Sequence, residues 1–477
     1  MAKRALSVMD ASWLHIESTE SPMQVGVMAI FSLPKDAPDD YVGQMVMDFK
    51  QQNEFYPPWN KKLRSSKLKS LRHFWVDDND LDLDYHVRHS ALPRPGGERE
   101  LGILVSRLHS HPLDFNRPLW EMHFIEGLEG DRFALYMKMH HSLIDGVGGS
   151  RMMSRIMAHG EKESLTMPAF WAVKPESRKK KVNPVATAAN AMGSAVEGAK
   201  SSGSSIPKII KALTQTLRAG SREDAMTAPF AAPKSILNGK ISAPRRFATQ
   251  QYSLSHLKEL AAAADCTLND IVLALCAASL RRYLKESNAL PKKPLTAGIP
   301  VSIRPADDTG TGNAISFIVA SMATDIADPR HRLEAIKAAT QDAKEHLQSL
   351  PASALTQYTM LLMAPYSLSM LTGMAGHVRP MFNVTVSNVP GPRDYLYLRG
   401  ARLEAAYPVS LVMHGQALNI TCQSYADTLN FGFTGCRDTV PHMQRLAVYM
   451  GEALKELESV ILANRGRKNV TRRKKAS

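Results

Sequence analysis

The sequence predicts a mixed α/β (α+β) fold that is divided into two units. The chain has 477 residues, more than one ordinary hydrophobic core holds, and 44% of them are hydrophobic. Strand-like and helix-like apolar patterns occur on both sides of residues 161–240, a basic segment rich in alanine and serine that can bury little core. We therefore expect units at 1–160 and 241–464, joined by a linker at 161–240 and followed by a basic tail at 465–477.

In the first half we expect strands and helices to alternate. Short apolar runs predict strands, and apolar residues at every third or fourth position predict helices. The expected strands are residues 25–33, 72–76, 81–87, 120–125 and 133–139, and the expected helices are 39–51 and 97–111. His109 and His111 lie at the end of the second helix, where the helix dipole favours imidazolium, so we expect them to be structural.

The strand at 133–139 leads directly into a group of chemically active residues. His140 and His141 follow it, then Asp145, and three of the next four residues are glycines that permit a tight turn before a helix near Val147. Adjacent side chains on an extended segment point to opposite faces, so we expect one histidine to be structural and the other to act as a general base. Paired histidines also suggest zinc, but the spacing of the metalloprotease motif is absent, and we expect no metal.

The second half repeats the mixture of strands and helices without a detectable sequence repeat. The expected strands are residues 246–254, 295–303, 315–322, 381–387, a short one near 411, 417–424 and 429–434, and the expected helices are 255–264, 268–284 and 440–462. Thr267 is suited to cap the second helix. Asp270 lies in the first turn, where an acidic residue stabilises a helix, so a structural role competes with any binding role.

One long span, residues 346–378, contains no Asp, Glu, Lys or Arg. Pro351 and Pro365 should interrupt it, and its many Ser, Thr and Gln residues make it too polar for a membrane-spanning helix. Ordinary core helices are one interpretation. The other is the wall of a tunnel for an aliphatic chain, or its membrane-facing mouth, because flexible methionines adapt to varied partners.

The net charge of +14 is concentrated in the linker and in the tail. Basic segments can be simply solvated or can attract an anionic membrane, and Ile209, Ile210, Leu213 and Leu217 would form one face of a basic amphipathic helix. No aromatic residues are interleaved with the charges, so we expect no nucleic-acid partner. The four cysteines form no CxxC pair and no secretory signal is visible, which predicts reduced thiols and a cytoplasmic location.

The HHxxxDG pattern formed by His140, His141, Asp145 and Gly146 resembles the active-site motif of the CoA-dependent acyltransferase superfamily. Within it the chain is most similar to the bacterial wax ester synthase/diacylglycerol acyltransferase family. The other motifs that carry the resemblance are Met9-Asp10-Ala11-Ser12-Trp13-Leu14, Pro118-Leu119-Trp120, Asn269-Asp270 and Ser387-Asn388-Val389-Pro390-Gly391-Pro392. The resemblance implies two chloramphenicol-acetyltransferase-like lobes with an active-site channel between them.

The resemblance also implies acyl transfer from acyl-CoA, a substrate, to a long-chain fatty alcohol or a diacylglycerol, with no cofactor. His141 would be the base, and Asp145 would organise the loop by pairing with an arginine, for which Arg304 is a candidate. Asn388 would stabilise an oxyanion. Ser387, Asn269 and Asp270 are further substrate-site candidates. Trp120 by itself favours a core position, and the resemblance implies only that this position lies near the active centre.

No serine or cysteine lies in a nucleophile elbow, so no acyl-enzyme is expected. Through the basic linker and tail we expect a cytoplasmic protein that associates peripherally with the inner membrane or with lipid inclusions. Two alternatives stay open: a non-catalytic protein that binds lipid inclusions or membrane surfaces, and a stand-alone condensation-type acyltransferase with another acceptor.

Overall fold

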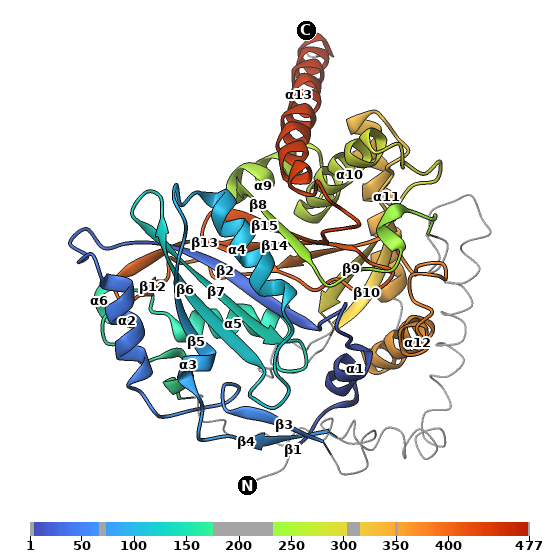
Figure 1. The fold of residues 1–477 in the computed structure, drawn as a ribbon. Coiled ribbons are helices and arrows are strands. Elements are labelled where there is room, and N and C mark those ends of the chain that lie inside the picture. Colours follow the sequence, from blue (N-terminus) through green and yellow to red (C-terminus); the bar gives the residue numbers. More distant parts are fainter. Residues whose placement is uncertain (1–3, 66–72, 175–231, 303–314, 349–351, 476–477) are drawn as a thin grey trace.

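The computed structural model describes residues 4–65, 73–174, 232–302, 315–348 and 352–475. Two six-stranded mixed sheets form the body of the molecule, with helices packed on their faces (Figure 1). A third sheet of three short strands, β1 (Arg4–Ala5), β4 (His73–Asp77) and β3 (Lys61–Ser65), lies beside the first. The expected mixed α/β class is confirmed.

The first sheet has the strand order β12-β13-β2-β7-β6-β5. Its strands are β2 (Gln24–Ser32), β5 (Val87–Ala91), β6 (Trp120–Leu128), β7 (Arg132–His140), β12 (Tyr397–Leu398) and β13 (Ala401–Val409). All neighbours are antiparallel except β5 and β6. Helices cover both faces, so β7 is buried along most of its length and its sequence is apolar on both sides.

Each face of the first sheet has its own helices. The helices of the first half are α1 (Val8–Ile16), α2 (Tyr41–Lys50), α3 (Leu83–His86), α4 (Glu98–Ser110), α5 (Gly146–Ile156), α6 (Glu161–Ser164) and the 3-10 turn η1 (Phe170–Ala172). Helices α2 and α5 and the turn η1 bury apolar residues against one face, and α4 packs on the other.

The second sheet has the order β10-β9-β11-β14-β15-β8. Its strands are β8 (Arg245–Ser253), β9 (Thr296–Ser302), β10 (Ile315–Ser321), β11 (Val384–Val389), β14 (Leu418–Tyr425) and β15 (Thr428–Cys436). The helices of this half are α9 (Leu254–Ala263), α10 (Leu268–Glu286), α11 (Pro329–Gln348), α12 (Ala352–Leu371) and α13 (Gln444–Lys475), and a 3-10 turn, η4 (Ile236–Asn238), precedes them. Helices α9, α10, α11 and α13 share one hydrophobic core with the sheet, and α13 projects beyond it (Figure 1).

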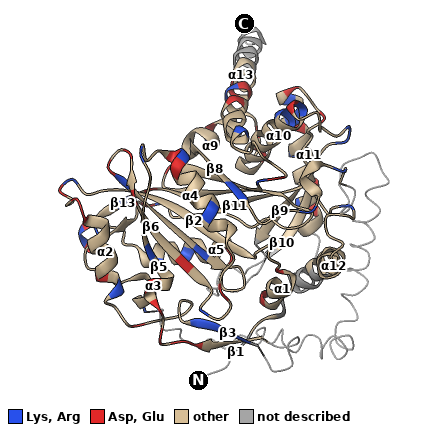
Figure 2. Ribbon diagram, viewed as in Figure 1, with Lys and Arg blue, Asp and Glu red and all other residues tan. Residues whose placement is uncertain are grey.

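Helix α12 differs from its neighbours because it carries no Lys, Arg, Asp or Glu (Figure 2). Its apolar side chains Leu361, Leu368 and Leu371 are 52%, 61% and 60% exposed. Among the described helices none alone is long and apolar enough to span a bilayer, although the bent pair α9 and α10, at 97°, meets that test by length and composition.

Several sequence expectations were wrong in detail. Of the expected strand 81–87 only Val87 is in a strand, as the first residue of β5, because Asp82 accepts a hydrogen bond from the backbone N–H of Tyr85 and caps the short helix α3. Helix α12 continues through Pro365, α11 was not anticipated, and α13 extends into the predicted tail.

Cys276, Cys422 and Cys436 are buried free thiols, and Cys266 is a half-buried one.

The predicted linker is not uniformly a linker. Phe170 and Trp171 are fully buried in the core of the first half, so the segment before residue 175 belongs to the fold. The expected amphipathic helix with Ile209 and Leu213 lies outside the described residues.

The two halves of the chain also contact each other through a shared sheet and through hydrogen bonds. Strand β13, from the second half, pairs with β2 in the first sheet over Arg402 to Val409. Helix α4 of the first half in turn contacts β8 of the second. The hydroxyl of Ser106 accepts a hydrogen bond from the backbone N–H of Phe247 (2.9 Å), and the hydroxyl of Ser110 accepts one from the backbone N–H of Arg245 (2.8 Å). The expected unit at 241–464 therefore does not stand apart from the unit at 1–160.

Candidate active site

The histidine motif lies where β7 ends and the chain turns into α5. The backbone N–H of His141 donates to the carbonyl of Met23 (2.8 Å), which ties the turn to the segment before β2. Asp145, 3% exposed, is the N-cap of α5, and its carboxylate accepts a hydrogen bond from the N–H of Gly148 (2.6 Å). Asp145 thus fixes the loop that carries His141 by capping the helix that follows it.

His140 is held by the protein at both ring nitrogens. It is 1% exposed, its Nε2 lies 2.6 Å from Oε2 of Glu17, and the backbone N–H of Ser142 donates to its Nδ1 (3.1 Å). Because an N–H can donate only to an unprotonated nitrogen, the proton of His140 lies on Nε2 and is donated to Glu17. This ring has no nitrogen left for a substrate.

His141 is half-buried and has a different environment. Its ring stacks on the indole of Trp13, with centroids 4.2 Å apart and planes 21° apart. Burial lowers the pKa of His141 to about 4, against the smaller raising effects of a hydrogen bond to its own backbone and of the Asp145 charge. At neutral pH the imidazole is therefore uncharged and able to accept a proton.

The histidine motif meets the Ser387–Pro392 motif across the interface between the halves. A Cβ placed on Gly146 would lie 3.1 Å from a methyl carbon of Val389. The hydroxyl of Ser150 donates to the carbonyl of Pro390 (2.8 Å). No residue with a side chain fits at position 391, because a Cβ there would lie 1.8 Å from the carbonyl oxygen of Ser424. The turn after β11 therefore packs on the start of α5.

Two of the predicted binding residues come together at this turn. The amide nitrogen of Asn388 donates to Oδ1 of Asn269 at the start of α10 (2.7 Å). Ser387 is half-buried within β11, opposite Thr421 of β14. Asp270 is 2% exposed, and its carboxylate accepts hydrogen bonds from Thr267 (2.7 Å and 2.8 Å) and Thr340 (2.6 Å). Asp270 thus closes a capping box on α10, and we assign it that structural role in place of substrate binding.

Trp120 lies in the core and not at a surface that a substrate could reach. It is fully buried, its indole N–H donates to the carbonyl of Trp59 (2.7 Å), and its ring stacks on His86 at 4.4 Å. Trp120 is therefore a core residue, as its sequence context favoured, and its side chain supports the sheet that carries the histidine motif.

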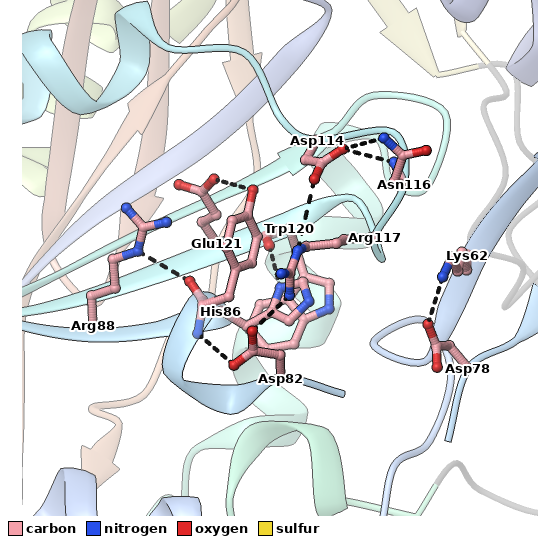
Figure 3. Close-up of polar contacts among 11 residues, drawn as sticks. Lys62, Asp78, Asp82, His86, Arg88, Asp114, Asn116, Arg117, Trp120 and Glu121 are labelled. Carbon is pink, nitrogen blue, oxygen red and sulfur yellow. Dashed lines mark hydrogen bonds and ion pairs between the residues drawn. The ribbon is translucent and has the colours of Figure 1, made fainter. Parts of the chain in front are cut away.

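A pocket of about 310 Å³ lies next to this tryptophan (Figure 3). It is lined by Asp82, Asp114, Arg117 and their neighbours, and includes no residue of the histidine motif. Arg117 bonds Asp82 (2.8 Å) and lies over the ring of Tyr85 (4.1 Å), so these contacts anchor the turn that enters β6. We regard the pocket as part of the scaffold.

Two residues at the site were not predicted from the sequence as contacts, namely Trp13 and Glu17. Glu17 and His140 are 123 residues apart, and no spacing in the sequence could pair them. The proposed arginine partner of Asp145, Arg304, lies outside the described residues.

His109 has a structural role, as expected, but it is not held in the expected imidazolium form. This residue is 2% exposed and its ring is bonded to the hydroxyl of Tyr136 (2.8 Å) and the carbonyl of Ser410 (3.1 Å). Burial lowers its pKa to about 3, so it is neutral despite its place at a helix C-terminus.

In the described part of the chain no three His, Cys, Asp or Glu side chains are grouped so as to hold a metal ion.

Comparison with known proteins gives a consistent picture. Residues 6–272 match the catalytic domain of the wax ester synthase/diacylglycerol acyltransferase family, and residues 311–458 match its C-terminal domain. A Mycobacterium tuberculosis protein named for diacylglycerol O-acyltransferase activity is 47% identical over 95% of this chain and 97% of its own length. The O-acyltransferase WSD of Acinetobacter baylyi is 39% identical over 96% and 98%.

Solved structures agree. The wax ester synthase/diacylglycerol acyltransferase from Marinobacter aquaeolei is 38% identical, covers 96% of this chain and 99% of its own, and superposes with a TM-score of 0.77. A condensation domain of the calcium-dependent antibiotic synthetase shares the two-lobed fold alone, with 14% identity, coverage of 96% of both chains and a TM-score of 0.60. The chain therefore belongs to the wax ester synthase/diacylglycerol acyltransferase family and is an acyltransferase.

Proposed function

We propose that this enzyme transfers the acyl group of a long-chain acyl-CoA directly to the hydroxyl of a long-chain fatty alcohol or a diacylglycerol, with His141 as the general base. The relatives named for these activities support the substrate classes. The observation that carries the proposal is the uncharged imidazole of His141, presented at the end of β7 beside the interface between the two halves.

In this reaction His141 removes the proton of the hydroxyl as the oxygen attacks the thioester carbonyl. The C–O bond forms, the C–S bond breaks, and the imidazolium returns the proton to the departing CoA thiolate. Nδ1 of His141 is buried, so we assign the proton transfers to Nε2. General-base assistance of this kind contributes roughly 10²–10⁴-fold.

The other residues of the motifs have supporting roles in this proposal. His140, Asp145 and Gly146 shape the turn that presents His141. Asn388, oriented by Asn269, supplies a hydrogen bond to the oxyanion of the tetrahedral intermediate, and Ser387 lies beside it on β11. No cofactor enters these steps.

The decisive experiment follows CoA thiol release from palmitoyl-CoA with hexadecanol, with a diacylglycerol, or with neither. We expect release that depends on an acceptor, and a loss of at least about 100-fold for His141→Gln, because the base is removed. Unchanged activity of His141→Gln would overturn the role of His141. Binding of both lipids without thiol release would favour the non-catalytic lipid-binding alternative, and release that requires an amine would favour a condensation-type reaction.

We also propose that the enzyme works at a lipid surface, as a peripheral protein of the inner membrane or of lipid inclusions. The exposed leucines of the uncharged helix α12 and the seven Lys and Arg residues after Glu458 support this. Deleting residues 465–477 should weaken salt-sensitive binding to anionic liposomes, and Leu361→Gln/Leu368→Gln should weaken the salt-insensitive part. Flotation of liposomes measures both, and binding that neither change affects would remove these surfaces from the proposal.

A further inference from the structure

The N-terminal helix α1 contributes one contact to each histidine of the motif. Trp13 stacks on the ring of His141, and Glu17, the residue that ends α1, bonds the ring of His140. Trp13 lies on α1 and Glu17 is its C-cap, so the C-terminal end of this helix contacts both histidines of the motif.

The contact of Glu17 selects one tautomer of His140. Nδ1 of that ring is occupied by the backbone N–H of Ser142, and Glu17 accepts the proton that Nε2 carries. The carbonyl of His140 also accepts the N–H of Leu143 (2.9 Å). The turn that holds His141 is thus built on the His140 ring, and the ring can serve in this way only while Nδ1 is unprotonated.

The contact of Trp13 affects His141 in two ways. The indole face restricts rotation of the imidazole, and when the ring is protonated during the reaction, the face attracts the positive charge. Trp13 itself packs against an apolar cluster formed by Met23, Tyr366, Leu411 and Met413. Helix α1 also contacts α12, so the indole has little freedom to move away from the histidine.

We propose that Trp13 and Glu17 are positioning residues for the transfer reaction. Trp13 holds the His141 ring and stabilises its protonated form, and Glu17 holds His140 as the tautomer that maintains the turn. The proposal rests on the proposed function of His141 as the base. It assigns a catalytic purpose to a helix that lies outside both the histidine motif and the Ser387–Pro392 motif.

The first test compares Trp13→Leu with Trp13→Phe in the thiol-release assay. Leucine keeps an apolar side chain but removes the aromatic face, and we expect kcat to fall about tenfold with KM for palmitoyl-CoA changed less than about twofold. Phenylalanine keeps an aromatic face and should retain kcat within about threefold. Equal kcat for wild type and Trp13→Leu, with equal melting temperatures, would overturn the role of Trp13.

The second test compares Glu17→Leu with Glu17→Gln. Glutamine can still accept the Nε2 proton, so we expect it to retain kcat within about threefold, whereas leucine should lower kcat by tenfold or more. In protein labelled with ¹⁵N-histidine, the His140 signal, assigned with His140→Gln, should show the Nε2-protonated form in wild type and in Glu17→Gln. Loss of that form in Glu17→Gln, or equal loss of kcat in both variants, would overturn the tautomer argument.

Ser12→Ala provides the matched control, because Ser12 is exposed on the same helix. It should leave kcat and KM within about twofold of wild type, and a large loss would show that any change in α1 has the same effect. The two proposals fail separately. If wild type releases no thiol with either acceptor, the proposed function fails, whereas an active wild type with fully active Trp13→Leu and Glu17→Leu refutes only the role of α1.

Discussion

His140 and His141 are adjacent in the sequence but have different roles in this site. His140 uses both nitrogens inside the protein, whereas His141 lies half-buried against an indole face and is neutral because burial lowers its pKa. The sequence could predict that adjacent histidines on a strand would separate in role. It could not predict which one would be structural, because that depends on Glu17, which is distant in the chain.

The amide pair of Asn388 and Asn269 leads to a prediction about coupling. Asn388→Ala should lower kcat about 10- to 100-fold if the amide stabilises the oxyanion, and Asn269→Ala should lower it less, because it only frees the Asn388 amide to rotate. The double variant should be no worse than Asn388→Ala alone, since the two act as a unit. Kinetics of all four proteins measure the coupling. Losses that simply multiply would show that the two amides act independently.

Among the elements, the contact between α5 and β11 is tight enough to be tested by adding one methyl group. Gly146→Ala would bring Cβ within 3.1 Å of Val389, so we expect about 1 kcal/mol of destabilisation and a loss of kcat. Val389→Ala should remove the clash and restore much of both in the double variant.

Gly149→Ala is the matched control for this prediction. The nearest atom to its Cβ is 4.0 Å away, on Ile144, so the same change in the same helix should be tolerated. Urea unfolding and kcat measure the outcome. Equal sensitivity at both glycines would mean that α5 tolerates no alanine, and that the packing on Val389 is not the cause.

Helices and strands whose apolar residues recur at regular spacing were predicted well. Those whose conformation depends on a hydrogen-bonded cap or on a strand distant in the sequence were not. Strands β2, β7, β8 and β15 and helix α10 lie within a few residues of their expected bounds, because burial decides their pattern. The segment 81–87 alternates like a strand, yet the cap at Asp82 makes part of it a helix. The second half's contribution to the first sheet left no local signal, because pairing between β13 and β2 depends on the fold of the whole chain.

At the scale of the molecule, buried histidines should make stability depend on pH. Burial lowers the pKa of His86, His109, His123 and His141, so between pH 6.5 and about 4 the unfolded chain binds protons that the folded chain does not. Stability is therefore greatest above pH 6.5 and falls as the pH decreases. Between pH 6.5 and about 4, His109 and His141 each contribute a slope of about 1 kcal/mol per pH unit.

Urea unfolding at pH 7.5, 6.5 and 5.5 measures this dependence. In His109→Gln the slope, and not merely the stability at one pH, should be smaller than in wild type by about 1 kcal/mol per pH unit. An unchanged slope would mean that His109 is protonated in the folded protein, in conflict with its burial.

The pairing of β13 with β2 also sets the order of events during synthesis. A ribosome that has released residues 24–140 has released most of the first sheet, but the edge of β2 stays open until residues 401–409 emerge. At usual rates of translation that interval is on the order of tens of seconds. An open strand edge invites pairing with other chains. Nascent molecules should thus need a chaperone or rapid elongation during that interval, and a fragment ending before β13 should precipitate when it is produced alone.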